Sequence, residues 1–198
     1  AFFQQGYLSV AMRLVPREIR TLKQLNMPEI LYEFTKFSQG LFLCVGPIGQ
    51  GKSTTLAALV NEINHTQEKH IVTIEDPIEY IYEQDKCIIS QREVNQDTRS
   101  FEAALRSVFR EDANVILIGE MRDLETIRTA LTAAETGHLI FGTLHTNDSS
   151  QTIDRIIDVF PPDQQNQIRS QLASSLLGVI SQRLMPLINA WLALPTWT

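Results

Sequence analysis

The sequence predicts an α/β fold in which helices cover both faces of a mostly parallel sheet. Short apolar runs alternate with amphipathic helical segments from residue 41 onward, which is typical of such folds. A glycine-rich loop separates the first apolar run from the first long helix, a context known from phosphate-binding loops. Further apolar runs end in acidic residues or a histidine, and ligands of open α/β sheets bind at that edge.

The elements are predicted in chain order as follows. Residues 1–15 alternate enough to be the last strands of a preceding domain, and residues 16–40 are expected to form a linker and a first helix that opens near Pro28. The four predicted strands are 41–45, 71–74, 115–118 and 139–144. Helices are predicted over 52–64, 100–109 and 124–136, and on both sides of Pro161 and Pro162. The last helix is expected to include Leu176, Val179 and Ile180, which continue its apolar spacing.

The glycine-rich loop satisfies the pattern G-x-x-x-x-G-K-[ST] between a strand and a helix, as that pattern requires. Glycines let the backbone turn its N–H groups toward an anion, and the dipole of the following helix favours negative charge. We expect Lys52 to reach the β- and γ-phosphates of ATP and Ser53 to ligate Mg²⁺. The predicted cofactor-binding residues are Gly46, Pro47, Ile48, Gly49, Gln50, Gly51, Lys52, Ser53 and Thr54.

The ends of the other predicted strands supply candidates for catalysis. Glu75 and Asp76 follow the second strand, with Glu79 close behind, and Glu120 follows the third. A carboxylate is suited to orienting a water and accepting its proton beside a phosphate and a metal. We expect Glu120 to act on the metal shell or on the water. One of the three earlier acids would supply the remaining carboxylate function, while Glu75 and Asp76 would also suit a helix or turn cap.

A histidine and several arginines are expected near the same edge. His145 ends the fourth strand, either as a sensor that hydrogen-bonds the γ-phosphate or a carboxylate, or as a core histidine. Most of the arginines are expected to form surface ion pairs. One or two of them would instead serve as arginine fingers that reach a nucleotide, including one bound to a neighbouring subunit. The arginines considered for this role are Arg92, Arg106, Arg110, Arg122 and Arg128.

Composition narrows the function classes. The chain has 198 residues, of which 43% are hydrophobic and 20% charged, as in an ordinary globular protein. The formal net charge of -6 disfavours binding to nucleic acid, and no apolar run is long enough to predict membrane insertion. Cys44 and Cys87 lack metal-binding spacing and are expected to be free thiols.

Four blocks of the sequence resemble the secretion ATPases that drive type II secretion and type IV pili. They correspond to the Walker A, Asp box, Walker B and His box of that family and lie at 46–54, 73–80, 115–123 (VILIGEMRD) and 133–147 (AAETGHLIFGTLHTN). The finer resemblance is to the twitching-motility, pilus-retraction branch (PilT type). It is carried by residues 87–94 (CIISQREV), 104–112, 152–161 and 179–184.

The resemblance implies a RecA-like ATPase motor domain over 41–185, with residues 1–15 as the tail of an N-terminal PAS-like domain. It makes Glu120 the Walker B glutamate, Glu79 the base of the Asp box, and His145 the residue that couples nucleotide state to subunit movement. Arg13 falls where the family has an arginine that can face nucleotide. The implied assembly is a hexameric ring on the cytoplasmic side of the inner membrane. It would act on a polytopic pilus platform protein and power retraction by ATP-driven subunit rotation.

The sequence departs from the family pattern at three places. Ile48 and Gln50 replace the usual Thr and Ser of the phosphate loop, at variable positions. Ala113 and Asn114 stand where Pro-Asp is usual, which favours a looser turn into the Walker B strand. The pattern fails after Met185, so residues 186–198 are interpreted as a truncated or frame-altered tail.

Three alternative functions stay open at this point. One is a pilus-extension or type II secretion ATPase of the same family. Another is a nucleotide-binding fragment that does not turn ATP over. The third is a RecA-like nucleic-acid translocase, against which the net charge of -6 and the lack of a basic, aromatic run both weigh.

Overall fold

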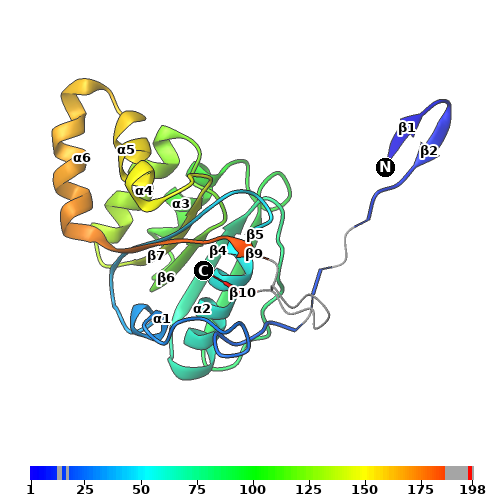
Figure 1. The fold of residues 1–198 in the computed structure, drawn as a ribbon, viewed down its shortest axis with the longest axis horizontal. Coiled ribbons are helices and arrows are strands. Elements are labelled where there is room, and N and C mark those ends of the chain that lie inside the picture. The colour runs from blue at the N-terminus through cyan, green and yellow to red at the C-terminus, as the bar shows by residue number, and fades with distance from the viewer. Residues whose placement is uncertain (13–14, 17, 186–195, 198) are drawn as a thin grey trace.

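The computed structural model describes residues 1–12, 15–16, 18–185 and 196–197. A six-stranded, fully parallel sheet with the order β5-β4-β6-β7-β3-β8 forms its centre (Figure 1). Its strands are β3 (Gly40–Val45), β4 (His70–Glu75), β5 (Ile88–Glu93), β6 (Val115–Ile118), β7 (Leu139–Leu144) and β8 (Leu176–Ser181). The predicted α/β fold with a parallel sheet is confirmed.

The four predicted apolar runs form the four inner strands of this sheet. β3, β6 and β7 are buried along their whole length, as continuous apolar runs in a parallel sheet should be. Successive side chains alternate between the two faces, so Leu41 and Leu43 pack in one core cluster and Phe42 and Cys44 in the other. The sheet therefore separates two hydrophobic layers.

Helices cover both faces of the sheet, also as predicted. One layer contains α3 (Phe101–Val108), α4 (Leu124–Glu135), α5 (Ser149–Asp158) and α6 (Pro162–Ser175). The other contains α1 (Leu31–Phe34) and α2 (Lys52–Thr66). Asp123 accepts a hydrogen bond from the Thr126 N–H and so caps α4, and Gly137 follows that helix with a φ of 104°. Both roles agree with the predicted limits of this helix.

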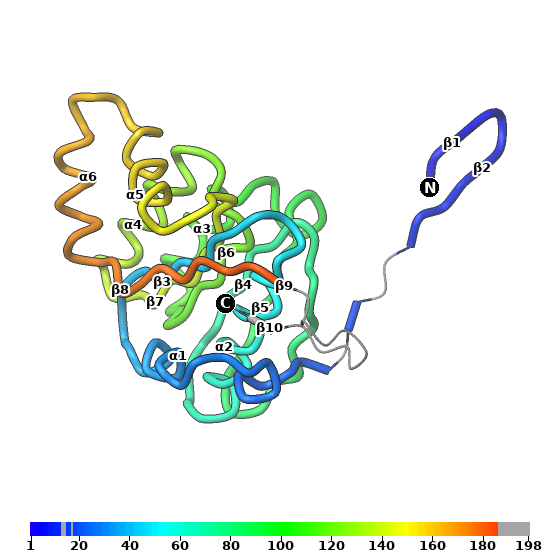
Figure 2. The backbone as a smooth tube through the Cα atoms, in the orientation of Figure 1, coloured from blue at the N-terminus to red at the C-terminus, as the bar shows by residue number. Residues whose placement is uncertain are grey.

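Two strands of the six-stranded sheet were not predicted. β8 replaces the expected continuation of the last helix, because α6 ends at Ser175 and Leu176 is already extended. Within β8, Gly178 leaves room for Phe34, since a Cβ there would lie 2.9 Å from the Phe34 ring. Figure 2 shows β8 running beside β3, its only strand partner in the six-stranded sheet. β5 has one neighbour too, and an edge strand with polar residues gives no apolar run to detect.

The first helix and the turn into β6 differ from expectation in detail. α1 is a single turn of four residues, and Gly40, the last residue of the segment predicted to be linker and first helix, instead begins β3. The turn into β6 is held firmly: Asn114 exchanges backbone hydrogen bonds with His70 and Leu139, and its side-chain oxygen accepts the His70 N–H at 2.8 Å. Asn114 thus supplies the fixed turn that the usual Pro-Asp would provide.

The two ends of the described chain form small antiparallel pairs. β1 (Phe2–Gln4) and β2 (Tyr7–Ser9) make a hairpin that Figure 1 shows apart from the main body. β9 (Leu184–Met185) pairs with β10 (Thr196–Trp197). Strands within residues 1–15 are therefore confirmed, whereas their membership of a PAS-like domain stays a prediction. The interpretation of the tail falls largely on residues outside the described ranges.

Candidate functional site

A cavity of about 840 Å³ lies at the edge of the sheet where the parallel strands end. The glycine-rich loop after β3 lines it together with residues from the ends of β4, β6 and β7. The predicted site residues that line it are Ile48, Gly49, Gln50, Gly51, Lys52, Ser53, Thr54, Glu75, Asp76, Glu79, Glu120 and His145. The topology thus brings residues nearly 100 positions apart to one place, as predicted for an open α/β sheet.

The phosphate loop owes its shape to its glycines. Gly46, Gly49 and Gly51 have φ values of 144°, 78° and 80°, which favour glycine over residues with a side chain. Gly46 also has no room for a Cβ, which would lie 2.3 Å from the carbonyl oxygen of Gln182. α2 begins directly after Gly51, so the loop leads into the N-terminus of a 15-residue helix. Such an N-terminus attracts anions.

Lys52 is buried at the base of the loop, and its ammonium group has three partners. Nζ donates to the carbonyl oxygens of Gly46 at 2.7 Å and Pro47 at 2.9 Å. It also lies 3.1 Å from Nδ1 of His145. Burial lowers the pKa of Lys52, and the nearby carboxylates of Glu120 and Glu79 oppose that effect. The cation is therefore held by neutral oxygens that a phosphate would replace with a stronger partner.

Glu120 and His145 form a chain of contacts with Lys52. Because the ammonium of Lys52 can only donate, Nδ1 of His145 accepts, and Nε2 carries the hydrogen toward Glu120 Oε1 at 3.1 Å. Glu120 is also paired with the Nε–H of Arg122. Burial would raise the pKa of Glu120, but the hydrogen bonds from Arg122 and His145 and the charge of Arg122 outweigh it, and the pKa is lowered. Glu120 is thus kept ionised.

The acids after β4 occupy different environments. Glu75 is only 7% exposed and accepts hydrogen bonds from the Thr73 hydroxyl at 2.7 Å and the Glu79 N–H at 3.4 Å. Burial raises the pKa of Glu75. Its geometry matches the turn-capping alternative, since it holds the backbone of the following segment. Asp76 is exposed, and Glu79 is half-buried with its side chain on the cavity.

Sequence reasoning missed the residues that brace the phosphate loop from behind. Gln182 is 3% exposed, donates its N–H to the Val45 carbonyl, and accepts the Thr55 hydroxyl at 2.9 Å and the Cys44 thiol at 3.3 Å. Burial raises the pKa of that thiol to about 12. Gln50, a departure from the family pattern, accepts the Leu184 N–H at 2.7 Å. The only signal in the sequence was the matching block at 179–184.

The candidate arginines are mostly engaged elsewhere. Arg92 binds Glu111 at 2.7 Å and Ser107 at 3.2 Å, and Arg106 pairs with Glu102 one helical turn away. Among the described residues that line the cavity, the arginines are Arg20 and Arg122, so Arg92, Arg106 and Arg110 are not part of it within this chain. Arg13 lies outside the described residues. Any role of these arginines across a subunit boundary stays a prediction.

The donor set suits Mg²⁺ bound through a substrate better than a metal bound by protein alone. Across the described ranges, no group of three or more His, Cys, Asp or Glu side chains is arranged to hold a metal ion. Mg²⁺ in phosphate sites needs only one or two protein oxygens, with phosphates and waters as its other ligands. The Ser53 hydroxyl and the Glu120 carboxylate both line the cavity and fit that requirement.

The described helices include none with the length and apolar character needed to cross a membrane.

Comparison with known proteins places the chain among secretion and pilus proteins. Residues 6–190 match the family described as "Type II/IV secretion system protein". The chain is 52% identical to the type IV pilus retraction ATPase PilT of Pseudomonas aeruginosa over 96% of its own length and 55% of the relative. It is also 52% identical to a twitching motility protein of Neisseria gonorrhoeae, over 89% of this chain and 47% of that one.

A solved structure supports the same relationship. The pilus retraction motor PilT with bound ADP superposes with a TM-score of 0.95 at 52% identity, covering 99% of this chain and 56% of the solved one. The chain thus spans about half the length of the relatives it matches. With a family match over nearly all of its residues, the chain belongs to the type II/IV secretion system protein family.

Proposed function

We propose that this chain is the ATP-binding and ATP-hydrolysing part of a motor that powers type IV pilus retraction, the activity behind twitching motility. The observation that carries the proposal is the cavity itself. It joins a buried lysine in a glycine-rich loop to Glu79, Glu120 and His145 at one sheet edge. The identity of 52% to PilT and to a twitching motility protein supports this choice of motor.

Nucleotide binding is assigned to the loop from Gly46 to Thr54. Its backbone N–H groups and the N-terminus of α2 would hold the phosphates of ATP. The ammonium of Lys52 would exchange its contacts with the Gly46 and Pro47 carbonyls for the β- and γ-phosphates. Ser53 and Glu120 would hold Mg²⁺, which supplies charge neutralisation on the phosphates when bound.

Hydrolysis is assigned to the carboxylates that line the same cavity. Glu79 would accept a proton from the attacking water as its oxygen bonds to the γ-phosphorus and the bond to the β-phosphate oxygen breaks. Glu120, kept ionised by Arg122 and His145, would orient the water and the metal shell. His145 bridges Lys52 and Glu120, so loss or gain of the γ-phosphate near Lys52 would be passed to Glu120 through it.

The assembly and its setting follow from the family resemblance. Residues 41–185 would act as the motor domain of a hexameric ring, with residues 1–15 as the tail of an N-terminal PAS-like domain. The ring would work on the cytoplasmic side of the inner membrane against a pilus platform protein. Arg13, Arg92, Arg106 and Arg110 are the candidates for contact with a nucleotide on a neighbouring subunit.

The pilus-extension or type II secretion ATPase is the second candidate function. A type II secretion system protein E of Xanthomonas campestris matches at 40% identity over 89% of this chain, which keeps that role a candidate. The retraction role is favoured because retraction proteins match at 52%. A nucleotide-binding unit without turnover is the remaining rival, and hydrolysis assays distinguish it directly.

The test is steady-state ATP hydrolysis with Mg²⁺ over a series of protein concentrations, alongside Glu120→Ala. We expect a specific activity that rises with concentration, as for a site completed between subunits, and that is lost in the variant. Wild-type hydrolysis by Glu120→Ala would contradict the role of that carboxylate. Tight ATP binding without turnover at any concentration would favour the nucleotide-binding unit instead.

A further inference from the structure

The segment that carries Glu79 has no regular secondary structure. Residues 76–84 leave β4 and reach the turn before β5 without forming a helix or a strand. A base that takes a proton from water must nevertheless be held within hydrogen-bond reach of it. The contacts that hold this segment therefore decide where Glu79 lies.

Gln91 of β5 holds the segment on both sides of Ile81. Its Nε2 donates to the carbonyl oxygen of Tyr80 at 2.8 Å, and its Oε1 accepts the N–H of Tyr82 at 3.0 Å. One primary amide thus replaces the two backbone groups that a neighbouring strand would offer. Gln91 itself is fixed by the register of β5, in which it lies opposite Thr73 of β4.

The position just before Glu79 is fixed from the same strand. The Ile78 N–H donates to Oε2 of Glu93, two residues beyond Gln91, at 3.0 Å. Glu79 therefore lies between a residue bound to Glu93 and a residue bound to Gln91. Its own N–H donates to the carboxylate of Glu75 at 3.4 Å.

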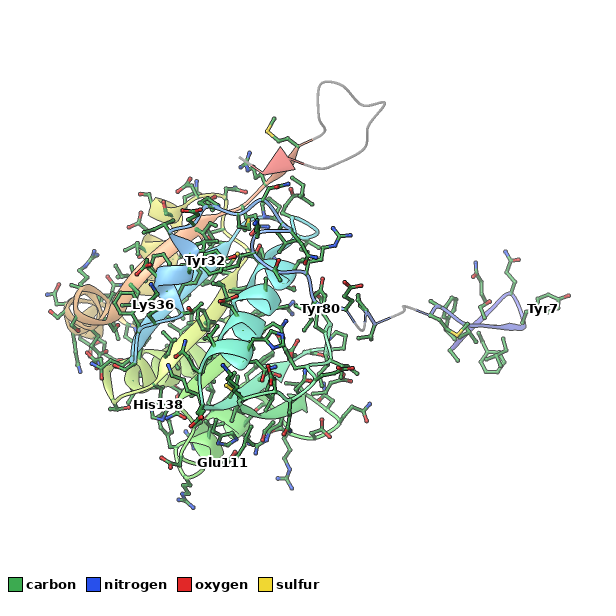
Figure 3. All side chains as sticks on the ribbon, turned by 90° about the horizontal axis from the view of Figure 1, so that it is seen from below. Tyr7, Tyr32, Lys36, Tyr80, Glu111 and His138 are labelled. Atoms are coloured by element: carbon green, nitrogen blue, oxygen red, sulfur yellow. The ribbon has the colours of Figure 1, made fainter. Side chains whose placement is uncertain are left out.

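A further hydrogen bond connects the segment to the phosphate loop. The Tyr80 hydroxyl lies 2.8 Å from the Thr54 hydroxyl, and Thr54 is two residues after Lys52 in the first turn of α2. Tyr80 lies beside α2 in Figure 3. The residue next to Glu79 is thus tied at its backbone to Gln91 and at its side chain to the helix that begins at the phosphates.

We propose that Gln91 is a positioning residue for ATP hydrolysis, which sets Glu79 against the phosphate loop through Tyr80. This inference rests on the proposed function, in which Glu79 is the base. The residue type follows from the two contacts, because an uncharged amide donates and accepts at once. Glutamate would lose the donor to Tyr80, and leucine would lose both groups at a similar volume.

The first test compares Gln91→Leu with the control Gln165→Leu. Gln165 is half-buried in α6 and donates from its amide to the Phe160 carbonyl oxygen at 3.1 Å, outside the cavity and away from the segment that carries Glu79. For Gln91→Leu we expect kcat to fall about tenfold or more, a displacement of the base being worth up to about 10²-fold. The affinity for a fluorescent ADP analogue should stay within about threefold, and the control should keep wild-type values. Equal losses in both variants, or a loss of affinity that matches the loss of kcat, would overturn the proposal.

A double mutant separates positioning from general destabilisation. If Gln91 acts through Glu79, Gln91→Leu should cause little further loss of kcat in a Glu79→Gln background. A full second loss there would mean that Gln91 does not work through Glu79. Gln91→Glu keeps the acceptor for Tyr82 but sets a carboxylate against the Tyr80 carbonyl and beside Glu75, so it should not restore kcat above the level of Gln91→Leu.

Amide exchange gives a readout that does not depend on turnover. Gln91→Leu should speed hydrogen exchange at the Tyr82 N–H and leave the amides of α2 unchanged, and an unchanged Tyr82 rate would overturn the clamp. The possible failures are distinguishable. A wild-type chain without ATPase activity overturns the proposed function and this role together. An active chain that loses activity on Glu79→Gln but not on Gln91→Leu overturns the role of Gln91 alone.

Discussion

The two walls of the cavity are built in opposite ways. The phosphate loop spans the six residues 46–51 between a buried strand and a long helix, and its shape comes from glycine dihedrals. The facing segment, residues 76–84, is held by side chains from β4, β5 and α2. The loop therefore takes its shape mainly from its own glycines, with Gln182 packed behind it, whereas the placement of Glu79 depends on side chains of other elements because its own segment forms no helix or strand.

Because the two walls are held differently, nucleotide binding and turnover should respond to different substitutions. Changes in the phosphate loop remove the cradle that both the ground state and the transition state need. Changes in the facing segment, or in the side chains that hold it, should spare binding and slow the chemical step. The following predictions test this separation.

The largest effect is expected from Glu79→Gln. Loss of the base should lower kcat by about 10²- to 10⁴-fold, the usual contribution of general base catalysis. ADP affinity should change by no more than about threefold. Glu83→Gln, an exposed glutamate in the same segment that does not line the cavity, is the matched control. Steady-state kinetics with a nucleotide titration measure both quantities, and a Glu79→Gln protein that turns over like the control would break the comparison.

Lys52→Ala tests the other wall. Removing the buried ammonium should weaken ADP binding by about 10²- to 10³-fold, as for the loss of a charged donor in a pre-formed anion site. Lys69→Ala serves as control, because Lys69 also has a pKa lowered mainly by burial but lies away from the cavity. Isothermal titration with ADP and Mg²⁺ measures the effect. Equal affinities of the two variants would show that the loop does not depend on its lysine.

Tyr80→Phe tests the hydrogen bond that joins the segment of Glu79 to the first turn of α2. Loss of the hydroxyl bond to Thr54 should cost about 1 kcal/mol of the free energy of unfolding and lower kcat by less than about tenfold. Tyr32→Phe, in α1 and outside the cavity, should change neither. Urea unfolding and ATPase assays on the same preparations measure both. A loss of ADP binding in Tyr80→Phe would mean that the walls are not separable.

The smallest effect concerns stability and pH at Glu75. Burial raises its pKa above the ordinary 4.5, so between pH 4.5 and the raised pKa the folded state holds a proton that the unfolded state has lost. Stability therefore falls as the pH rises through that window. Glu75→Gln removes this titration, and its gain over wild type, about 1 kcal/mol or less, should grow with pH and then level off. Urea unfolding from pH 4 to 8, with exposed Glu68→Gln as control, checks it, and a pH-independent gap would contradict it.

Much of the fold could be predicted because its signals are local. The four inner strands are apolar runs, and the phosphate loop is a contiguous motif with its strand and helix beside it. β5 and β8 escaped prediction because edge strands need not be apolar: β5 carries Gln91, Arg92 and Glu93, and β8 continues the spacing of the helix before it. Both segments become strands because they pair with a neighbouring strand of the sheet, and the order of the sequence does not reveal that pairing.

Parts of the candidate site could likewise be predicted from local sequence, and other parts could not. The sequence indicates which residues lie at the strand ends, because parallel strands end at one edge. It does not indicate that Gln182 and Leu184 contact the phosphate loop or that Gln91 holds the neighbours of Glu79, since those contacts join distant segments through single side chains. It also does not separate Glu75 from Glu79, whose difference is burial: Glu75 is 7% exposed beneath the segment that carries Glu79.

The proposed function requires that this cavity bind ATP at the phosphate loop and hydrolyse it with Glu79. The most direct measurement is a single-turnover experiment, in which a trace of ATP is mixed with excess protein and Mg²⁺ and the bound nucleotide is identified over time. We expect that wild type converts bound ATP to ADP, that Glu79→Gln keeps bound ATP intact, and that Lys52→Ala retains no nucleotide. Conversion of bound ATP by Glu79→Gln at the wild-type rate, or intact ATP on the wild-type protein, would contradict it.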